Sequence, residues 1–120
     1  MKKQYRVKKN QEIELILKEK HFSKNKYFSL YQRRNPETIH FRYAISVGKK
    51  IGNAVTRNRV KRQVTSIIDN LNIKMDSNLD VFIIVRAEIL NLSFDDMKHE
   101  LEYLFKKQKL LKGDIKWANF

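Results

Sequence analysis

The longest uninterrupted apolar stretch of the chain covers residues 81–85, with the sequence Val-Phe-Ile-Ile-Val. A run of β-branched and aromatic residues is typical of a strand, and this one leaves no polar side to face water. We therefore expect a strand over residues 80–86 that is buried on both faces. The stretch is far too short to span a bilayer, so no membrane partner is expected.

Two further segments alternate between sides, as half-buried strands do. In residues 27–32, one side carries Phe28 and Leu30. The other side carries Tyr27, Ser29 and Tyr31. Residues 39–47 have an apolar side chain at every odd position. Because a turn over residues 33–38 separates the two segments, we expect them to pair as a hairpin with a longer loop.

Three segments repeat apolar residues at helical spacing. A short helix over residues 11–20 has three apolar residues on one face: Ile13, Ile16 and Leu17. A longer helix over residues 54–70 follows a favourable cap at Asn53. Its core-facing residues are Val60, Val64, Ile67, Ile68 and Leu71. A third helix follows Ser93, which forms a capping-box pattern with Asp96, and its apolar residues are Met97, Leu101, Leu104 and Phe105.

The expected order α-β-β-α-β-α is that of an α+β protein. We predict a two-layer α/β sandwich, in which helices cover one face of a small sheet. No repeat and no Ser/Gly/Pro-rich linker interrupts the pattern, so residues 1–120 are expected to form a single RNA-binding domain, for reasons of charge given next. The basic N-terminus has no apolar stretch behind it, unlike a secretory signal, and this predicts a cytoplasmic protein.

Positive charge is confined to the first part of the chain. Residues 1–68 hold 18 Lys and Arg against four Asp and Glu, a net charge of +14, whereas residues 69–120 hold eight against nine, a net charge of −1. No carboxylate lies between Glu37 and Asp69. The basic residues of that window are Arg42, Lys49, Lys50, Arg57, Arg59, Lys61 and Arg62. Such a region suits a polyanion such as RNA, and the simpler alternative is a solvated basic face that binds nothing specific.

The densest basic segment falls on the predicted helix over residues 54–70. At about 100° per residue, one ridge beside its buried face carries Asn58, Lys61, Arg62 and Thr65, with Arg57 at the N-terminal edge and Arg59 further round. Arg binds phosphate bidentately, and the free N–H groups of a helix N-terminus favour an anion. No acidic partner follows at i+4 to relieve the repulsion, so this ridge predicts an external anionic partner.

A nuclease site within the polypeptide itself is not expected. Protein nucleases need positioned acid and base groups, or carboxylates clustered to hold Mg²⁺. His21, His40 and His99 fall on three different predicted elements. The acidic residues of the third helix are explained by the helix dipole and a solvated face. We therefore predict no catalytic residue and no metal ligand in this chain, and the absence of cysteine removes thiolate chemistry.

At residues 49–62 the sequence reads Lys-Lys-x-Gly-Asn-Ala-Val-x-Arg-Asn-Arg-x-Lys-Arg, which resembles the signature of the protein component of bacterial ribonuclease P. The segment Tyr-Phe-x-Leu-Tyr at 27–31 and Val-Arg at 85–86 are similar to that family as well. The resemblance covers nearly the whole chain and implies a ribosomal protein S5 domain 2-like fold. It also implies a subunit of an endoribonuclease whose catalytic groups lie in the RNA subunit.

The resemblance assigns two sets of candidate site residues. The implied contacts with the catalytic RNA are Lys49, Lys50, Asn53, Arg57, Asn58, Arg59, Lys61 and Arg62. The implied candidates for the cleft that binds the 5′ leader of precursor tRNA are Ile13, Leu17, Tyr27, Ser29, Tyr31 and Arg86. Lys49 and Lys50 either touch RNA or simply flank the loop. The alternative for Tyr27 and Tyr31 is a partly covered side of the sheet with hydroxyls in water.

The implied partners are the ribonuclease P catalytic RNA and precursor tRNA, with no obligate protein partner. Mg²⁺ is expected to act through the RNA subunit. Two negatively charged RNAs repel each other, so a protein of net charge +13 between them should lower the Mg²⁺ or salt that they need. Two alternatives stay open from the residues alone. One is a ribosomal or other structural RNA-binding protein, and the other is a protein-only nuclease.

Overall fold

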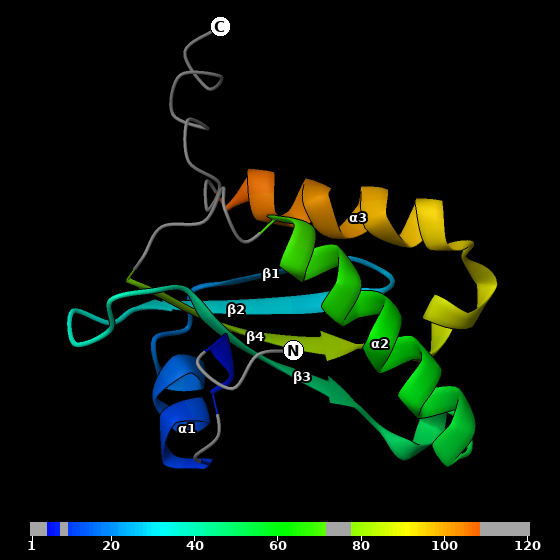
Figure 1. Ribbon diagram of the computed structural model, residues 1–120, viewed down its shortest axis with the longest axis horizontal. Coiled ribbons are helices and arrows are strands. Elements are labelled where there is room, and N and C mark those ends of the chain that lie inside the picture. Colours follow the sequence, from blue (N-terminus) through cyan, green and yellow to red (C-terminus); the bar gives the residue numbers. More distant parts are fainter. Residues whose placement is uncertain (1–4, 8–9, 72–77, 109–120) are drawn as a thin grey trace, which may run out of the picture.

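The computed structural model describes residues 5–7, 10–71 and 78–108. Its helices are α1 (Asn10–Lys18), α2 (Ala54–Leu71) and α3 (Phe94–Lys107). Its strands are β1 (Phe22–Lys24), β2 (Phe28–Arg34), β3 (Arg42–Val47) and β4 (Leu79–Val85). Two short 3-10 helices, η2 (Lys49–Ile51) and η4 (Ala87–Asn91), follow β3 and β4 (Figure 1). The predicted α+β class and element order are confirmed, with β1 as an addition that was too short to show alternation.

The four strands form one sheet in the order β1-β2-β4-β3. Strand β4 pairs antiparallel with β2 and parallel with β3. The predicted hairpin between residues 27–32 and 39–47 is therefore wrong, because β4 lies between these two strands. Val81 and Ile83 of β4, the most apolar strand, are fully buried. Because β4 lies between β2 and β3, the backbone N–H and C=O groups on both its edges can pair with neighbouring strands.

The second predicted strand is also shorter than residues 39–47. Strand β3 begins only at Arg42, and Ile39 is 87% exposed. The side chain of Asn35 accepts a hydrogen bond from the backbone N–H of Glu37, and the hydroxyl of Thr38 donates to the Asn35 carbonyl. These bonds extend the turn, so residues 39–41 stay outside the sheet and β3 begins only at Arg42.

Helices α2 and α3 cover one face of the sheet and build the main core with it (Figure 1). All the residues predicted to face the core from these helices are buried: Val60, Val64, Ile67, Ile68, Leu71, Met97, Leu101, Leu104 and Phe105. Both predicted caps form, since Asn53 Oδ1 accepts from the N–H of Thr56 at 2.9 Å and Ser93 Oγ accepts from the N–H of Asp96 at 3.2 Å. Helical periodicity and capping therefore located this layer correctly.

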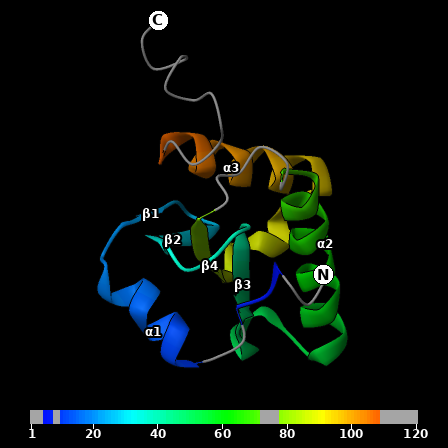
Figure 2. The same cartoon turned by 60° about the vertical axis from the view of Figure 1, so that its left-hand side comes forward.

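Helix α1 lies on the opposite face of the sheet, as Figure 2 shows. Its Ile16 is fully buried in a second, smaller cluster with Val7 and Ala44. This helix covers only part of its face, so Phe82 and Ile84 of β4 stay half-buried. The prediction that the strand would be buried on both faces is thus wrong for its α1 side, which remains partly open.

Candidate RNA interface

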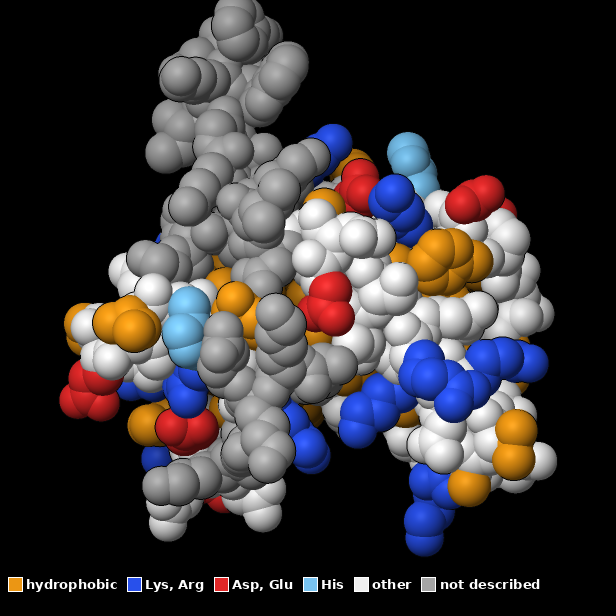
Figure 3. Space-filling view, in the orientation of Figure 1, with side chains coloured by type: hydrophobic (Ala, Val, Ile, Leu, Met, Phe, Trp, Pro, Cys, Tyr) orange, Lys and Arg blue, Asp and Glu red, His pale blue; other side chains and the backbone are white. Residues whose placement is uncertain are grey.

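The basic residues of α2 are exposed, apart from the half-buried Arg57, and lack an ion-pair partner among the described residues. Asn58, Arg59, Lys61 and Arg62 are exposed, and Arg57 is half-buried. Within the described part of the chain, none of the four cations among these residues forms an ion pair. Figure 3 shows Lys and Arg side chains gathered over the N-terminal half of α2. We call the set Arg57, Asn58, Arg59, Lys61 and Arg62 the α2 basic surface.

The loop before α2 places two more lysines beside this surface. Lys49 and Lys50 are exposed in η2, and Gly52 follows with a φ of 152°. A side chain at Gly52 would be strained by this φ, and its Cβ would lie 3.1 Å from the Thr56 side chain. Glycine therefore allows η2 to turn directly into the capped N-terminus of α2, whose first N–H groups favour an anion.

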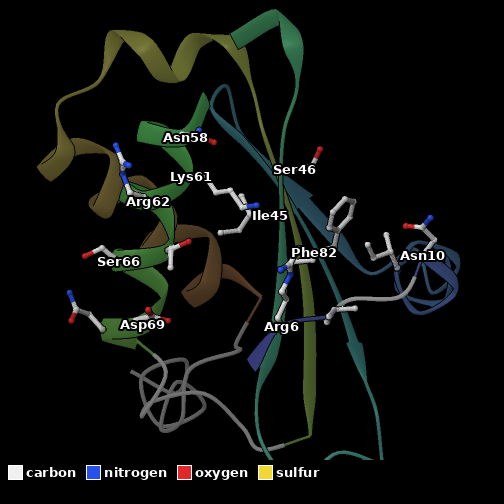
Figure 4. A pocket seen from close by; sticks show the side chains of 15 residues that line it. Arg6, Asn10, Ile45, Ser46, Asn58, Lys61, Arg62, Ser66, Asp69 and Phe82 are labelled. Carbon is white, nitrogen blue, oxygen red and sulfur yellow. The ribbon is translucent and has the colours of Figure 1, made fainter. Parts of the chain in front are cut away.

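A groove of about 930 Å³ runs between α2, the β3 edge of the sheet and the N-terminal side of α1 (Figure 4). Three cations line it: Arg6, Lys61 and Arg62. Its amides and hydroxyls come from Asn10, Ser46, Asn58, Thr65, Ser66 and Asn70, and its apolar side chains from Val7, Ile13, Ala44, Ile45 and Phe82. This mixture provides phosphate, sugar and base-edge contacts within one hollow.

Asp69 is the one carboxylate among the residues that line this groove. It accepts a hydrogen bond of 2.7 Å from the hydroxyl of Tyr43, which is fully buried. Burial, together with the neighbouring Asp69 carboxylate, raises the pKa of Tyr43 above its usual range. Tyr43 therefore remains a neutral donor to Asp69, and one oxygen of that carboxylate is already engaged.

A smaller hollow of about 280 Å³ adjoins the groove, between β3 and the first turns of α2. Arg57 lines it together with Asn58 and Lys61. The Nε atom of Arg57 is buried and has no hydrogen-bond partner within the described residues. An unpartnered buried donor costs about 1–3 kcal/mol, so an acceptor from a ligand is favoured here.

Arg42 does not belong to the basic surface, although it falls in the window without carboxylates. Its Nε and Nη2 atoms donate to the buried carboxylate of Asp80 at 3.0 and 2.8 Å, and Nη1 lies 3.4 Å from Glu12 of α1. The hydrogen bond to Asp80 raises the pKa of Arg42 further. Asn35 also donates to Asp80, at 3.0 Å. This network joins α1 to β3 and β4, so the positive charge of Arg42 stabilises the fold and does not contribute to the basic surface.

The leader-cleft candidates do not all gather in one place. Ile13 lines the groove and, with Tyr31, packs against the α1-side cluster. Ser29 shares the face of Tyr31, whereas Leu17 is 37% exposed on α1. Tyr27 precedes β2 and packs against the main core, so its predicted place beside Ser29 and Tyr31 is wrong.

The reason for the displacement of Tyr27 is a local turn. Asn25 Oδ1 accepts hydrogen bonds from the backbone N–H groups of Tyr27 and Phe28, both at 2.8 Å. The alternation of β2 therefore starts only at Phe28. The carbonyl of Tyr27 accepts from the N–H of Arg86 at 2.8 Å, which brings these two candidates together where β2 begins and β4 ends. Neither residue lines the groove.

Residues considered for nuclease chemistry stay apart. His21 precedes β1, His40 precedes β3 and His99 lies on α3. Across residues 5–7, 10–71 and 78–108, no group of three or more His, Asp or Glu side chains is placed to hold a metal ion. No helix in the same residues is long and apolar enough to cross a membrane.

The sequence profile of the Ribonuclease P family matches residues 1–109. The chain belongs to the ribonuclease P protein family. The ribonuclease P protein component of Enterococcus faecalis is 40% identical over 111 residues, which are 92% of this chain and 94% of that relative. Membership makes the chain a component of a ribonuclease that acts in tRNA processing as a ribonucleoprotein.

Solved structures of ribonuclease P proteins share this fold. The Staphylococcus aureus protein superposes with a TM-score of 0.84 at 33% identity, over 90% of this chain and 98% of that one. The Thermotoga maritima protein gives a TM-score of 0.75 at 28% identity, over 85% and 96% of the two chains. The resemblance drawn from residues 49–62 is confirmed at the level of family and fold.

Several residues of the groove in this ribonuclease P protein were missed from its sequence. They are Arg6, Asn10, Ser46, Ser66, Asp69, Asn70 and Phe82. Helical spacing could have found Ser66 and Asp69, which follow Arg62 by four and seven positions on one side of α2. Arg6 carries no such signal, because only the parallel bridge between Arg6 and Tyr43 brings it to the groove.

Proposed function

We propose that this chain binds the ribonuclease P catalytic RNA through the α2 basic surface and holds the 5′ leader of precursor tRNA in the adjoining groove. In this way it assists endonucleolytic removal of the leader, which produces the mature 5′ end of the tRNA. The observation that carries the proposal is that a set of cations without ion pairs among the described residues lies beside a mixed polar and apolar groove of about 930 Å³.

The chemistry of the α2 basic surface supports the contact with catalytic RNA. Arg57, Arg59 and Arg62 present guanidinium groups that match phosphate bidentately, from a helix whose position the core fixes. The unpartnered Nε of Arg57 offers a further donor to an RNA oxygen. Asn58 adds an amide that can both donate and accept, and Lys49, Lys50 and Asn53 flank the surface at the helix N-terminus.

The composition of the groove supports a single-stranded RNA ligand. Lys61 and Arg62 line both the groove and the basic surface, so one strand entering the groove stays within reach of the catalytic RNA. Serine and asparagine side chains can bond sugar and base edges, while Phe82 and Ile13 offer apolar contact to bases. The protein binds and positions, and the catalytic RNA with its Mg²⁺ supplies the bond-breaking groups in this proposal.

Charge explains how such a protein assists two RNAs. The chain carries a net charge of +13, and Lys61 and Arg62 of the α2 basic surface also line the groove proposed for the leader. Placing them there replaces counterions that the two RNAs would otherwise need. We expect the protein to lower the Mg²⁺ concentration required for cleavage and to act in the cytoplasm, where tRNA is made in bacteria.

The groove is tested by filling it. Ser46 is half-buried on β3 and lines the groove away from α2, so Ser46→Phe would occupy the space without removing a cation. We expect the variant ribonucleoprotein to lose about tenfold in affinity for precursor tRNA, and to keep its affinity for mature tRNA and for catalytic RNA. Equilibrium binding of both tRNAs measures this, with Ser46→Ala as the control.

Two outcomes would count against the proposal. If wild-type protein tightens binding of precursor and mature tRNA equally, the leader is not its ligand. If Ser46→Phe weakens binding of both tRNAs to the same degree while the protein stays folded, the groove does not hold the leader.

A further inference from the structure

The partly open face of the sheet carries two rows of side chains that lead from the groove to the outer edge strand β1. In the first row, Phe22 pairs with Tyr31, Tyr31 with Phe82, and Phe82 with Ala44. In the second row, the paired residues are Lys24, Ser29, Ile84 and Ser46. With strands about 4.8 Å apart, each row is roughly 14 Å long.

Helix α1 covers the middle of the first row and leaves its outer end free. Ile13 and Ile16 pack in the cluster that contains Tyr31, Phe82 and Ala44. Ser29, Ile84 and Ser46 of the second row are half-buried, and Ser46 lines the groove. The second row is therefore a half-buried strip of side chains that leads from the groove at Ser46 to β1.

Phe22 is an unusual residue for this position. It is 48% exposed on an edge strand of only three residues, where a large apolar side chain is normally avoided. Its ring stacks on Tyr31 with 5.0 Å between the ring centroids and 24° between their planes. Tyr31 thus covers one face of the ring, and about half of the Phe22 residue stays accessible to solvent.

Positive charge accompanies this aromatic ring. Lys24 is exposed, and the strand period of two places it on the same face of β1 as Phe22. The flanking residues Lys18, Lys20 and Lys26 are exposed as well, and none of these four lysines forms an ion pair within the described chain. An accessible aromatic ring beside unpaired lysines matches single-stranded nucleic acid, in which bases stack and phosphates need cations.

We propose that Phe22 and Lys24 form a second contact for single-stranded RNA at the outer edge of the sheet. Phe22 stacks on a base and Lys24 binds the neighbouring phosphate, at the outer ends of the first and second rows, away from the groove. The inference rests on the proposed function, because its ligand is the part of a longer leader that extends beyond the groove. Leaders that end within the groove do not reach Phe22.

Stacking is tested directly by fluorescence. Phe22→Trp in a Trp117→Phe background makes residue 22 the only tryptophan of the chain. A short single-stranded RNA added to this protein should quench its emission. Tyr103→Trp in the same background is the matched control, since Tyr103 is 57% exposed on α3 and should respond little. Equal quenching at both positions, or none at residue 22, would overturn the proposal.

Leader length gives the functional test. In the assembled ribonucleoprotein, Phe22→Ala should weaken binding of precursor tRNA with a long leader by about tenfold, and leave short-leader precursor and mature tRNA unchanged. Lys24→Glu should act in the same direction, with Lys98→Glu on α3 as its control. A loss that is the same at every leader length would overturn the inference. A wild-type protein without leader preference would instead contradict the proposed function.

Discussion

Removing the three arginines of α2 is expected to abolish most of the affinity for the catalytic RNA. The variant Arg57→Ala/Arg59→Ala/Arg62→Ala loses three cations that have no ion-pair partner within the described chain, so the fold loses little. At about 1 kcal/mol for each solvent-exposed ionic contact, the dissociation constant should rise roughly 100-fold. The slope of log affinity against log salt should fall by about 2–3 units. Equilibrium binding at several salt concentrations measures both quantities.

The matched control removes the same charge from the neighbouring helix α3, outside the α2 basic surface. Lys98, Lys106 and Lys107 are exposed on α3, and changing all three to Ala lowers the net charge equally. This control should change RNA affinity by no more than a few-fold, because its charges lie outside the α2 basic surface and act on the RNA only through solvent that salt screens. Equal losses in the two triple variants would mean that overall charge, rather than the α2 basic surface, determines binding.

Asp80→Ala is expected to cause the largest loss of stability. Asp80 is fully buried, and it accepts hydrogen bonds from both Arg42 and Asn35. Its removal leaves Arg42, whose side chain is 15% exposed, with only the 3.4 Å contact to Glu12. Breaking such a buried pair costs about 3–5 kcal/mol, a large share of the stability of a small domain. Urea denaturation of the purified protein measures the free energy of unfolding.

Two further variants show whether the loss of stability comes from a buried charge left without its partner or from the removal of any carboxylate. Arg42→Met/Asp80→Leu removes both charges together and should recover much of the lost stability, because no buried charge is left without its partner. Asp95→Ala, an exposed carboxylate in the first turn of α3, should cost about 0.3–1 kcal/mol. A loss below 1 kcal/mol for Asp80→Ala would show that the hydrogen bonds of Asp80 to Arg42 and Asn35 do not stabilise the fold.

The positions and buried faces of α2 and α3 could be predicted from local sequence patterns. The spacing of Val60, Val64 and Ile67, together with the cap at Asn53, located α2 and oriented its basic residues away from the core. The family signature at residues 49–62 lies on this helix, so the α2 basic surface could be predicted from the sequence. Helix geometry is local, and its consequences follow from one segment at a time.

The strand order and the groove residues outside α2 could not be predicted, because they depend on contacts between segments that are distant in the sequence. Nothing near residues 27–47 indicates that β4 inserts between β2 and β3. The neutralisation of Arg42 required Asp80, which is 38 positions away. Arg6 and Phe82 line the same groove as α2 residues, and they do so because Arg6 bridges to β3 and β4 pairs with β3. Tyr27 was misplaced because a side-chain turn at Asn25 delays the start of β2.

Cleavage of precursor tRNA at low Mg²⁺ and near-physiological salt tests whether this chain assists the catalytic RNA in removing the 5′ leader. Three samples are compared: the protein alone, a bacterial ribonuclease P RNA alone, and the two combined. We expect cleavage at the mature 5′ end only in the combined sample. Cleavage by the protein alone would contradict it by revealing a catalytic site in the chain. A combined sample no more active than the RNA alone, despite tight RNA binding, would contradict it by indicating a purely structural RNA-binding protein.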